Sequence, residues 1–179
     1  AAPGMAAEKD EMFFYDAGRF AYFDTGADGR HTGTINSGTY SANFQSIVPI
    51  DLDGDKTDEL ILHTTTGAFV AYDVRPGAVL SSPLVRATFS ATFERLVAMD
   101  LDGDQRDELL AYDAQTGRYA FYRMSTNGTV ASTIKSGTWS AGWTNLVGID
   151  VDGDQRDELM FYRGSDGLSS TYDVSVSGA

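Results

Sequence analysis

The sequence contains no cysteine, so disulfide bridges, thiolate metal sites and cysteine nucleophiles are all excluded. It has only two histidines, His31 and His63, which disfavours a histidine-rich zinc centre. Proline is scarce, with 4 residues, whereas glycine is frequent, with 19, and this balance favours tight turns over a disordered linker. No apolar run is long enough for a membrane-spanning helix, which needs about 18–20 residues.

Basic residues are also few, because 13 Lys and Arg stand against 26 Asp and Glu and give a net charge of −13 at pH 7. Such a surface repels phosphate backbones and anionic lipid headgroups. The charge therefore argues against nucleic acid and membrane surfaces as partners. The acidic residues are also distributed unevenly along the chain, and their positions are more informative than their number.

A ten-residue acidic segment recurs three times, as DLDGDKTDEL from Asp51, DLDGDQRDEL from Asp100 and DVDGDQRDEL from Asp150. The sequences around each copy recur with it, so the repeat is longer than the acidic segment. The stretch that opens at Asp10 resembles the part that follows each acidic segment, and it forms a fourth copy without an acidic loop. We expect a single repeat domain over residues 1–179, with copies at approximately 10–40, 41–89, 90–139 and 140–179.

Short apolar runs of about four residues precede and follow each acidic segment, and such runs predict strands rather than helices. In the third copy they are Leu96–Met99 and Leu109–Tyr112. A glycine turn then leads to an alternating aromatic strand at 118–122, and a second turn leads to a fourth strand at 130–134. Four antiparallel strands in about 50 residues match the size of one propeller blade.

The predicted fold is therefore all-β, a propeller-like array of about four four-stranded antiparallel blades. The terminal blades are incomplete, because the N-terminal copy lacks its first strand and the C-terminal copy ends after its third. A small closed propeller is the simplest arrangement. The alternative is an open array that pairs with another chain or with further sequence, and a homo-oligomer that completes the terminal blades is one form of it.

Each acidic loop has the chemistry of a cation site. In residues 51–59, oxygen donors recur at positions 1, 3 and 5, and Gly54 at position 4 permits the turn that points them at one centre. A carbonyl at position 7 and the Glu59 carboxylate at position 9 can close the shell. Calcium takes about six to eight such oxygens, whereas magnesium keeps more of its waters. An EF-hand is excluded because its position 12 requires Glu and here holds Leu62.

The packet D-x-D-G-D-x-x-D-E-L between two short strands resembles the calcium loop of FG-GAP/VCBS-type repeats, which occur in integrin α-chain propellers and in secreted bacterial and fungal propellers. The resemblance implies about three Ca²⁺ ions, with side-chain ligands at positions 1, 3, 5 and 9 and a carbonyl ligand at position 7. The residues at these positions are Asp51, Asp53, Asp55, Thr57 and Glu59; Asp100, Asp102, Asp104, Arg106 and Glu108; and Asp150, Asp152, Asp154, Arg156 and Glu158.

This sequence departs from the family pattern by having Glu rather than Asp at position 9. The departure leaves open whether the neighbouring aspartates at position 8 share the ligand role. These are Asp58, Asp107 and Asp157.

Aromatic residues recur at matching places in the repeat: Tyr40, Phe89 and Trp139, with Trp143 four residues beyond Trp139. They can form the core between blades, which stacked repeats require, or platforms on which sugar rings stack. We favour the core role and keep these four residues as candidate ligand-binding residues.

No G-x-S-x-G, H-E-x-x-H or phosphate-binding glycine loop occurs in the sequence, and its conspicuous carboxylates belong to the cation loops. We therefore expect a secreted, non-enzymatic, calcium-stabilised binding module whose partner is a glycan. The alternative is an adhesion or assembly module that binds an extracellular protein. A small secreted hydrolase or an enzyme-appended accessory domain is less favoured. The start Ala1-Ala2-Pro3, with no Met or apolar segment before it, suits a mature secreted protein or a domain of a longer one.

Overall fold

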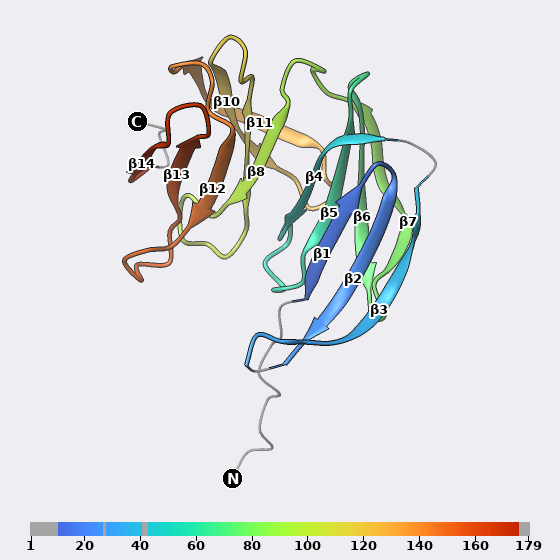
Figure 1. Cartoon of the computed structure of the whole chain (residues 1–179). Coiled ribbons are helices and arrows are strands. Elements are labelled where there is room, and N and C mark those ends of the chain that lie inside the picture. Colours follow the sequence, from blue (N-terminus) through green and yellow to red (C-terminus); the bar gives the residue numbers. More distant parts are fainter. Residues whose placement is uncertain (1–10, 27, 41–42, 176–179) are drawn as a thin grey trace. The chain divides into compact units, whose positions relative to one another are not determined.

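The computed structural model of the chain describes residues 11–26, 28–40 and 43–175 (Figure 1). In these residues it has fourteen strands and no helix, and hence no helix that could cross a membrane. The chain divides into two compact units. The first covers residues 1–43 and 75–79, and the second covers 44–74 and 80–179.

The first unit contains one three-stranded sheet in the order β1-β2-β3, with both pairs antiparallel. Its strands are β1 (Met12–Asp16), β2 (Arg19–Thr25) and β3 (His31–Thr39). Aromatic rings hold this sheet together, because Phe20 stacks on Tyr40 with ring centroids 4.4 Å apart and Phe13 packs on the buried Tyr22 at 4.6 Å.

The second unit contains the other three sheets, whose strand orders are β4-β5-β6-β7, β8-β9-β10-β11 and β12-β13-β14. Residues 75–79, which connect β6 to β7, are the exception, because they belong to the first unit. Their strands are β4 (Phe44–Ile50), β5 (Glu59–Thr64), β6 (Ala68–Arg75), β7 (Val79–Thr88), β8 (Arg95–Met99), β9 (Glu108–Tyr112), β10 (Arg118–Met124), β11 (Val130–Thr138), β12 (Asn145–Ile149), β13 (Glu158–Arg163) and β14 (Leu168–Tyr172). The predicted all-β class, with four antiparallel blades of which the two terminal ones lack a strand, is confirmed. Each sheet lies within one predicted repeat copy, and the single domain over 1–179 stays a prediction.

Strand β9 shows why a central strand carries an unbroken apolar run after its first residue. Alternate side chains of a strand point to opposite faces of its sheet. Leu109 packs in a core cluster with the β4–β7 sheet, and the next residue, Leu110, packs in a second cluster with the β12–β14 sheet. The β8–β11 sheet is therefore buried on both faces, which explains a continuous apolar run where a half-buried strand would alternate.

A glycine turn recurs between the second and third strands of each blade. Trp139 donates its main-chain N–H to the carbonyl of Gly117 at 2.9 Å, and Phe89 makes the equivalent 2.8 Å bond to Gly67. Gly117 has a φ of +76°, and a Cβ atom there would overlap the carbonyl oxygen of Trp139. Two properties of this turn therefore require glycine at position 117: its left-handed backbone conformation and the close approach of the main chain at Trp139.

Replacing Gly117 by alanine should lower the free energy of unfolding by about 3 kcal/mol or more, because left-handed strain and a backbone clash add. Gly167→Ala is the matched control, since Gly167 occupies the same turn of the last blade with a φ of +72° and has no neighbouring atom within 4 Å of its Cβ position. That variant should lose only about 1 kcal/mol. Urea unfolding of both variants measures the difference, and equal losses would contradict the close-approach argument.

Candidate metal centres and an aromatic pocket

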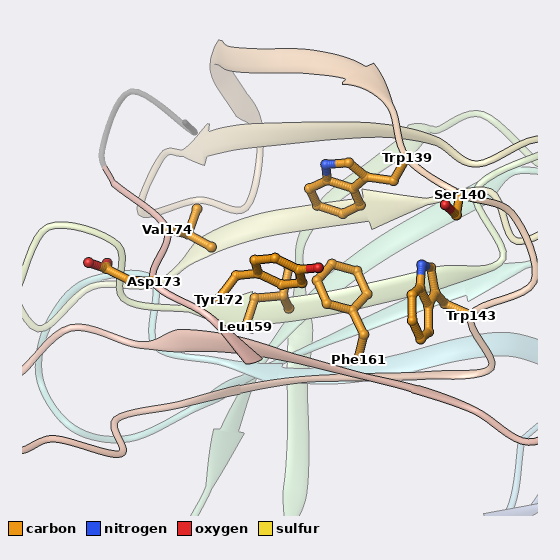
Figure 2. A pocket seen from close by; sticks show the side chains of 8 residues that line it. All are labelled: Trp139, Ser140, Trp143, Leu159, Phe161, Tyr172, Asp173 and Val174. Atoms are coloured by element: carbon orange, nitrogen blue, oxygen red, sulfur yellow. The ribbon is translucent and has the colours of Figure 1, made fainter. Parts of the chain in front are cut away.

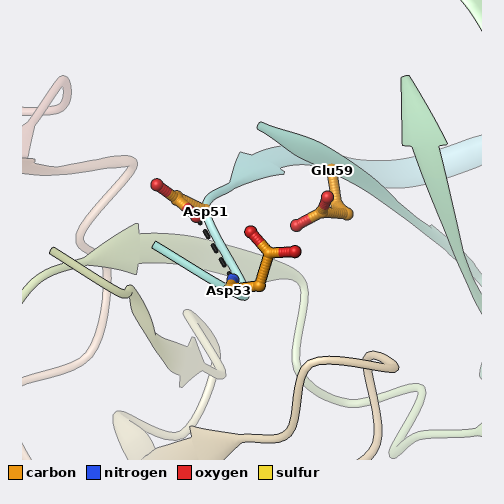
Figure 3. A group of neighbouring side chains, drawn as sticks. All are labelled: Asp51, Asp53 and Glu59. Carbon is orange, nitrogen blue, oxygen red and sulfur yellow. Dashed lines mark hydrogen bonds between the residues drawn. The ribbon is translucent and has the colours of Figure 1, made fainter. Parts of the chain in front are cut away.

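Each acidic loop joins the first two strands of its sheet and gathers three carboxylates. In every copy the residues at positions 1, 3 and 9 each offer one carboxylate oxygen that lies within 4.8 Å of the other two. Figure 3 shows the first group. The groups are Asp51, Asp53 and Glu59; Asp100, Asp102 and Glu108; and Asp150, Asp152 and Glu158.

The aspartate at position 1 organises the turn through its own side chain. Asp51 Oδ1 accepts the N–H of Gly54 at 2.7 Å, and its Oδ2 accepts the N–H of Lys56 at 2.9 Å. Glu59 Oε2 accepts the N–H of Leu52 at 3.0 Å, which ties position 9 back to the start of the loop. Asp100 and Asp150 make the corresponding bonds in their loops, and these internal bonds hold the carboxylates close together.

Burial and neighbouring negative charge disfavour the ionised forms of two of these carboxylates. The pKa of Glu59 is raised to about 7, chiefly by burial and to a smaller extent by the carboxylates of Asp53 and Asp51, and the hydrogen bond from Leu52 opposes the rise. In the second loop burial likewise raises the pKa of Glu108. Ionisation of Glu59 and Glu108 is therefore less favourable in the folded chain than in water.

The second loop provides a test of whether a cation fits. Asp102 Oδ1 is buried and accepts no hydrogen bond from the described residues. A buried carboxylate oxygen without a donor costs free energy unless a cation satisfies it. The side-chain donors of the three groups are all carboxylate oxygens, which suits hard ions such as Ca²⁺ or Mg²⁺ and disfavours soft metals. The residues present thus fit a divalent cation at each loop.

The position 5 aspartates lie outside these three-residue groups. Asp55 Oδ1 instead accepts the N–H of Thr57 at 2.8 Å, and Asp104 and Asp154 bond to Arg106 and Arg156 in the same way at 2.9 Å. Their predicted role as ligands, and that of the carbonyls of Thr57, Arg106 and Arg156, stays a prediction.

Two of the position 8 aspartates, Asp107 and Asp157, reach the loop of the preceding blade, a contact that sequence reasoning missed. Asp107 Oδ2 accepts the N–H of Asp51 at 2.8 Å, and the N–H of Asp107 donates to the carbonyl of Asp51 at 2.8 Å. Asp157 repeats both bonds with Asp100, at 3.0 and 2.8 Å. The presence of Asp at position 8 in all three copies was the available signal. These bonds couple each acidic loop to the next across the sheets.

Arginine at position 7 adds to this coupling. Arg106 Nε donates to the carbonyl of Leu52 at 2.8 Å, and its Cγ would lie 3.2 Å from a Cβ atom on Gly54. The side chain therefore lies along the preceding loop, where its positive charge faces acidic residues. The conformation of the first loop therefore depends in part on the position of Arg106 in the second loop.

The second loop differs from the other two because Arg123 bonds to its carboxylates. Arg123 Nη2 lies 2.6 Å from Asp102 Oδ2, and Nε lies 3.2 Å from Glu108 Oε1. The other two loops have no arginine at this place. The strand registers show that the positions equivalent to Arg123 are held by Asp73 after the first loop and by Asp173 after the third. The guanidinium occupies carboxylate lone pairs that a cation would otherwise use, so the second site should bind a cation most weakly.

Arg123→Gln should increase the affinity of the second loop for Ca²⁺ about tenfold, because a positive charge about 5 Å from a divalent ion opposes binding by on the order of 1–2 kcal/mol even when it is screened as in bulk water. Isothermal titration calorimetry resolves this change. Arg163→Gln is the matched control, since Arg163 pairs with Asp166 outside the three loops. Weaker binding by the Arg123 variant would show instead that the arginine positions the ligands.

A pocket of about 280 Å³ lies in the second unit, and aromatic rings form most of its wall (Figure 2). Trp139 stacks on Tyr119 with ring centroids 3.8 Å apart and meets Phe161 edge-on at 5.0 Å. Polar groups at the wall come from Ser140 and Asp173. The complete lining is Trp139, Ser140, Trp143, Leu159, Phe161, Tyr172, Asp173 and Val174.

Of the four candidate ligand-binding residues, the structure brings Trp139 and Trp143 together in this pocket. Trp143 is buried and belongs to the second core cluster, so it also has the core role that we favoured. Phe89 packs against the other cluster, and Tyr40 packs on Phe20 in the first unit. Sequence reasoning missed Tyr172, which comes from a strand edge that only the fold brings to Trp139. A ligand role for these residues stays a prediction.

Four antiparallel blades, three of which carry the repeated acidic loop, define a β-propeller-like repeat protein. Residues 100–161 match the FG-GAP-like repeat family, in agreement with the resemblance of the loop motif. No curated protein matches the sequence.

Solved structures support the fold alone. The chain resembles a candidate 6-phosphogluconolactonase from Bacteroides uniformis with a TM-score of 0.59 and 15% identity, over 94% of this chain and 49% of that one. It also resembles BBS1N, solved in complex with ARL6DN, with a TM-score of 0.51 and 12% identity, over 87% of this chain and 41% of that one. The chain thus spans about half the length, or less, of these propeller-like structures.

Proposed function

We propose that this protein is an exported, calcium-stabilised propeller-type module that binds carbohydrate without chemical turnover. The observation that carries the proposal is the aromatic pocket beside Trp139, which is held on a scaffold whose loops each gather three carboxylates. The metal and the ligand have separate roles in this proposal, the first in stability and the second in recognition.

Calcium is the cation that the loops suit best. Each loop offers several carboxylate oxygens and main-chain carbonyls on a turn that can adjust, and Ca²⁺ accepts many oxygens in flexible geometry, whereas Mg²⁺ requires a near-octahedral shell and retains water. When bound, the ion would neutralise the carboxylates at positions 1, 3 and 9. Asp107 and Asp157 accept hydrogen bonds from the main chain of the preceding loops, so an ion that fixes one loop would also stabilise the loop before it. Export suits such sites, because extracellular calcium modules work with dissociation constants of about 0.1–1 mM.

Calcium should raise the melting temperature by at least about 5 °C between EDTA and 2 mM CaCl₂. Three sites with dissociation constants of about 0.1–1 mM together contribute about 2–5 kcal/mol at 2 mM Ca²⁺, and each kcal/mol shifts the melting temperature of a chain of this size by about 2–4 °C. Asp102→Asn should retain part of the rise, because the other two carboxylate groups are intact. Differential scanning calorimetry measures both values. An equal rise in MgCl₂, or none in CaCl₂, would contradict the calcium assignment.

The pocket has the chemistry that sugar rings require. A pyranose ring presents an apolar C–H face, which packs on aromatic rings, and a rim of hydroxyls, which need hydrogen-bond partners. Tyr172 and Trp139 supply the rings, whereas Ser140 and Asp173 supply polar atoms. Ligand pockets commonly begin near 300 Å³, so about 280 Å³ matches a single sugar unit of a longer glycan.

Tyr172→Ala should reduce affinity for a glycan identified on an array by at least about tenfold, because it removes one aromatic wall. Tyr172 is 55% exposed, so the free energy of unfolding should change by no more than about 0.5 kcal/mol. Leu168→Ala is the control, since Leu168 lies on the same strand at 44% exposure and does not line the pocket. Array signals at background for the wild type, or equal affinity in both variants, would contradict carbohydrate binding here.

Assembly with another protein chain is the second candidate, because one observation favours it directly. The last sheet exposes large apolar side chains, among them Val151 and Ile149. Contiguous apolar exposure of this kind marks interaction surfaces.

A further inference from the structure

The last sheet exposes the face that the sheet before it buries. Ile149 and Val151 are 45% and 60% exposed, whereas the residues one repeat earlier, Met99 and Leu101, are fully buried. The first copy of the loop agrees with the second, since the corresponding Ile50 is fully buried as well. We call the exposed residues on β12, β13 and the intervening loop the open face, and they are Val147, Ile149, Val151, Met160 and Tyr162.

In the earlier blades, the following sheet covers this face. Leu109 and Ala111 of β9 share a core cluster with Ile50 and Leu52. One repeat later, Leu159 and Phe161 of β13 share a cluster with Met99 and Leu101. The partner that fits the open face is therefore a sheet of this same repeat, with apolar residues at the positions of Leu159 and Phe161.

The N-terminal sheet of this chain carries such a face and leaves it exposed. Strand pairing aligns Met12 and Phe14 with Leu109 and Ala111, because Phe14 opposes Ala21 in β2 as Ala111 opposes Ala120 in β10. Met12 and Phe14 are 36% and 53% exposed, in contrast to their buried equivalents. One chain thus presents both halves of a blade-to-blade interface, one half on its first sheet and the other half on its last.

Main-chain hydrogen bonds also favour a sheet of the same repeat as the partner of the open face. The N–H groups of Asp51 and Asp100 are each bonded by the position 8 aspartate of the next blade, and that of Asp150 has no such partner in the described part of the chain. In the earlier copies a sheet of the same repeat supplies this bond, which agrees with such a sheet as the partner of the open face.

We propose that the open face binds the N-terminal sheet of a second copy of this chain, and that two copies close head-to-tail into one ring. An interface between unlike faces makes either closed rings or open filaments. Two is the smallest number of copies in which each open face meets an N-terminal sheet of another copy and no such face stays exposed. This proposal is independent of the carbohydrate ligand.

Sedimentation velocity at 1–100 µM protein in 2 mM CaCl₂ tests the proposal. The wild type should have twice the mass of one chain. Ile149→Lys, on the open face, and Phe14→Lys, on the N-terminal face, should each give a monomer, because either change removes both interfaces of a two-copy ring. Val130→Lys is the matched control, since Val130 is a 42% exposed apolar residue on β11 outside both faces, and it should remain dimeric.

Mixing the two monomeric variants tests which faces meet. The intact last sheet of the Phe14→Lys chain can still bind the intact first sheet of the Ile149→Lys chain, so the mixture should recover a dimer that neither variant forms alone. Circular dichroism spectra that match the wild type show that each variant is folded.

Three results would overturn the proposal. The first is a monomeric wild type. If its open face is protected from hydrogen exchange, the chain closes on itself, and if that face is unprotected, a different partner covers it. A dimer that survives Phe14→Lys would mean that like faces meet. A mass that grows beyond two copies would mean that the head-to-tail contact forms filaments.

Discussion

Repulsion between carboxylates is the constraint on which the rest of this structure depends. Each of three loops holds three carboxylates with oxygens within 4.8 Å of one another. Main-chain N–H groups satisfy part of this negative charge, and burial together with neighbouring carboxylates raises the pKa of Glu59. A divalent cation would offset this cost, because it neutralises several carboxylates at once and needs no side chain from elsewhere in the chain.

The loops do not act singly, because each is bonded to the next. Asp107 and Asp157 link successive loops through paired main-chain and side-chain bonds, and Arg106 lies along the loop before its own. Repeat proteins gain stability from contacts between neighbouring repeats, and here such contacts are both apolar and polar. A cation bound at one loop therefore acts on two sheets. Arg123 makes the middle loop different, since it places a permanent positive charge where the other loops have none.

The same repeat geometry explains both the pocket and the exposed apolar residues. Stacked sheets bury the face of one against the back of the next. The pocket beside Trp139 is lined by residues of the last sheet and of the segments that flank it. On β12 and the loop that follows it, Ile149 and Val151 are exposed at positions where the preceding repeat has buried side chains. The proposed ligand site and the proposed assembly surface thus both lie on the last sheet of the described chain.

Sequence alone determined the all-β class, the fourteen strands and their grouping into blades, because apolar runs, glycine turns and the repeat are local patterns. It also located the carboxylates at positions 1, 3 and 9, whose convergence follows from spacing within one loop. Only the tertiary structure decided that Asp107 bonds to Asp51, that Arg123 reaches the second loop and that Tyr172 lines the same pocket as Trp139. Those contacts join residues of different strands or blades, and their partners are set by how sheets stack, which no local spacing encodes.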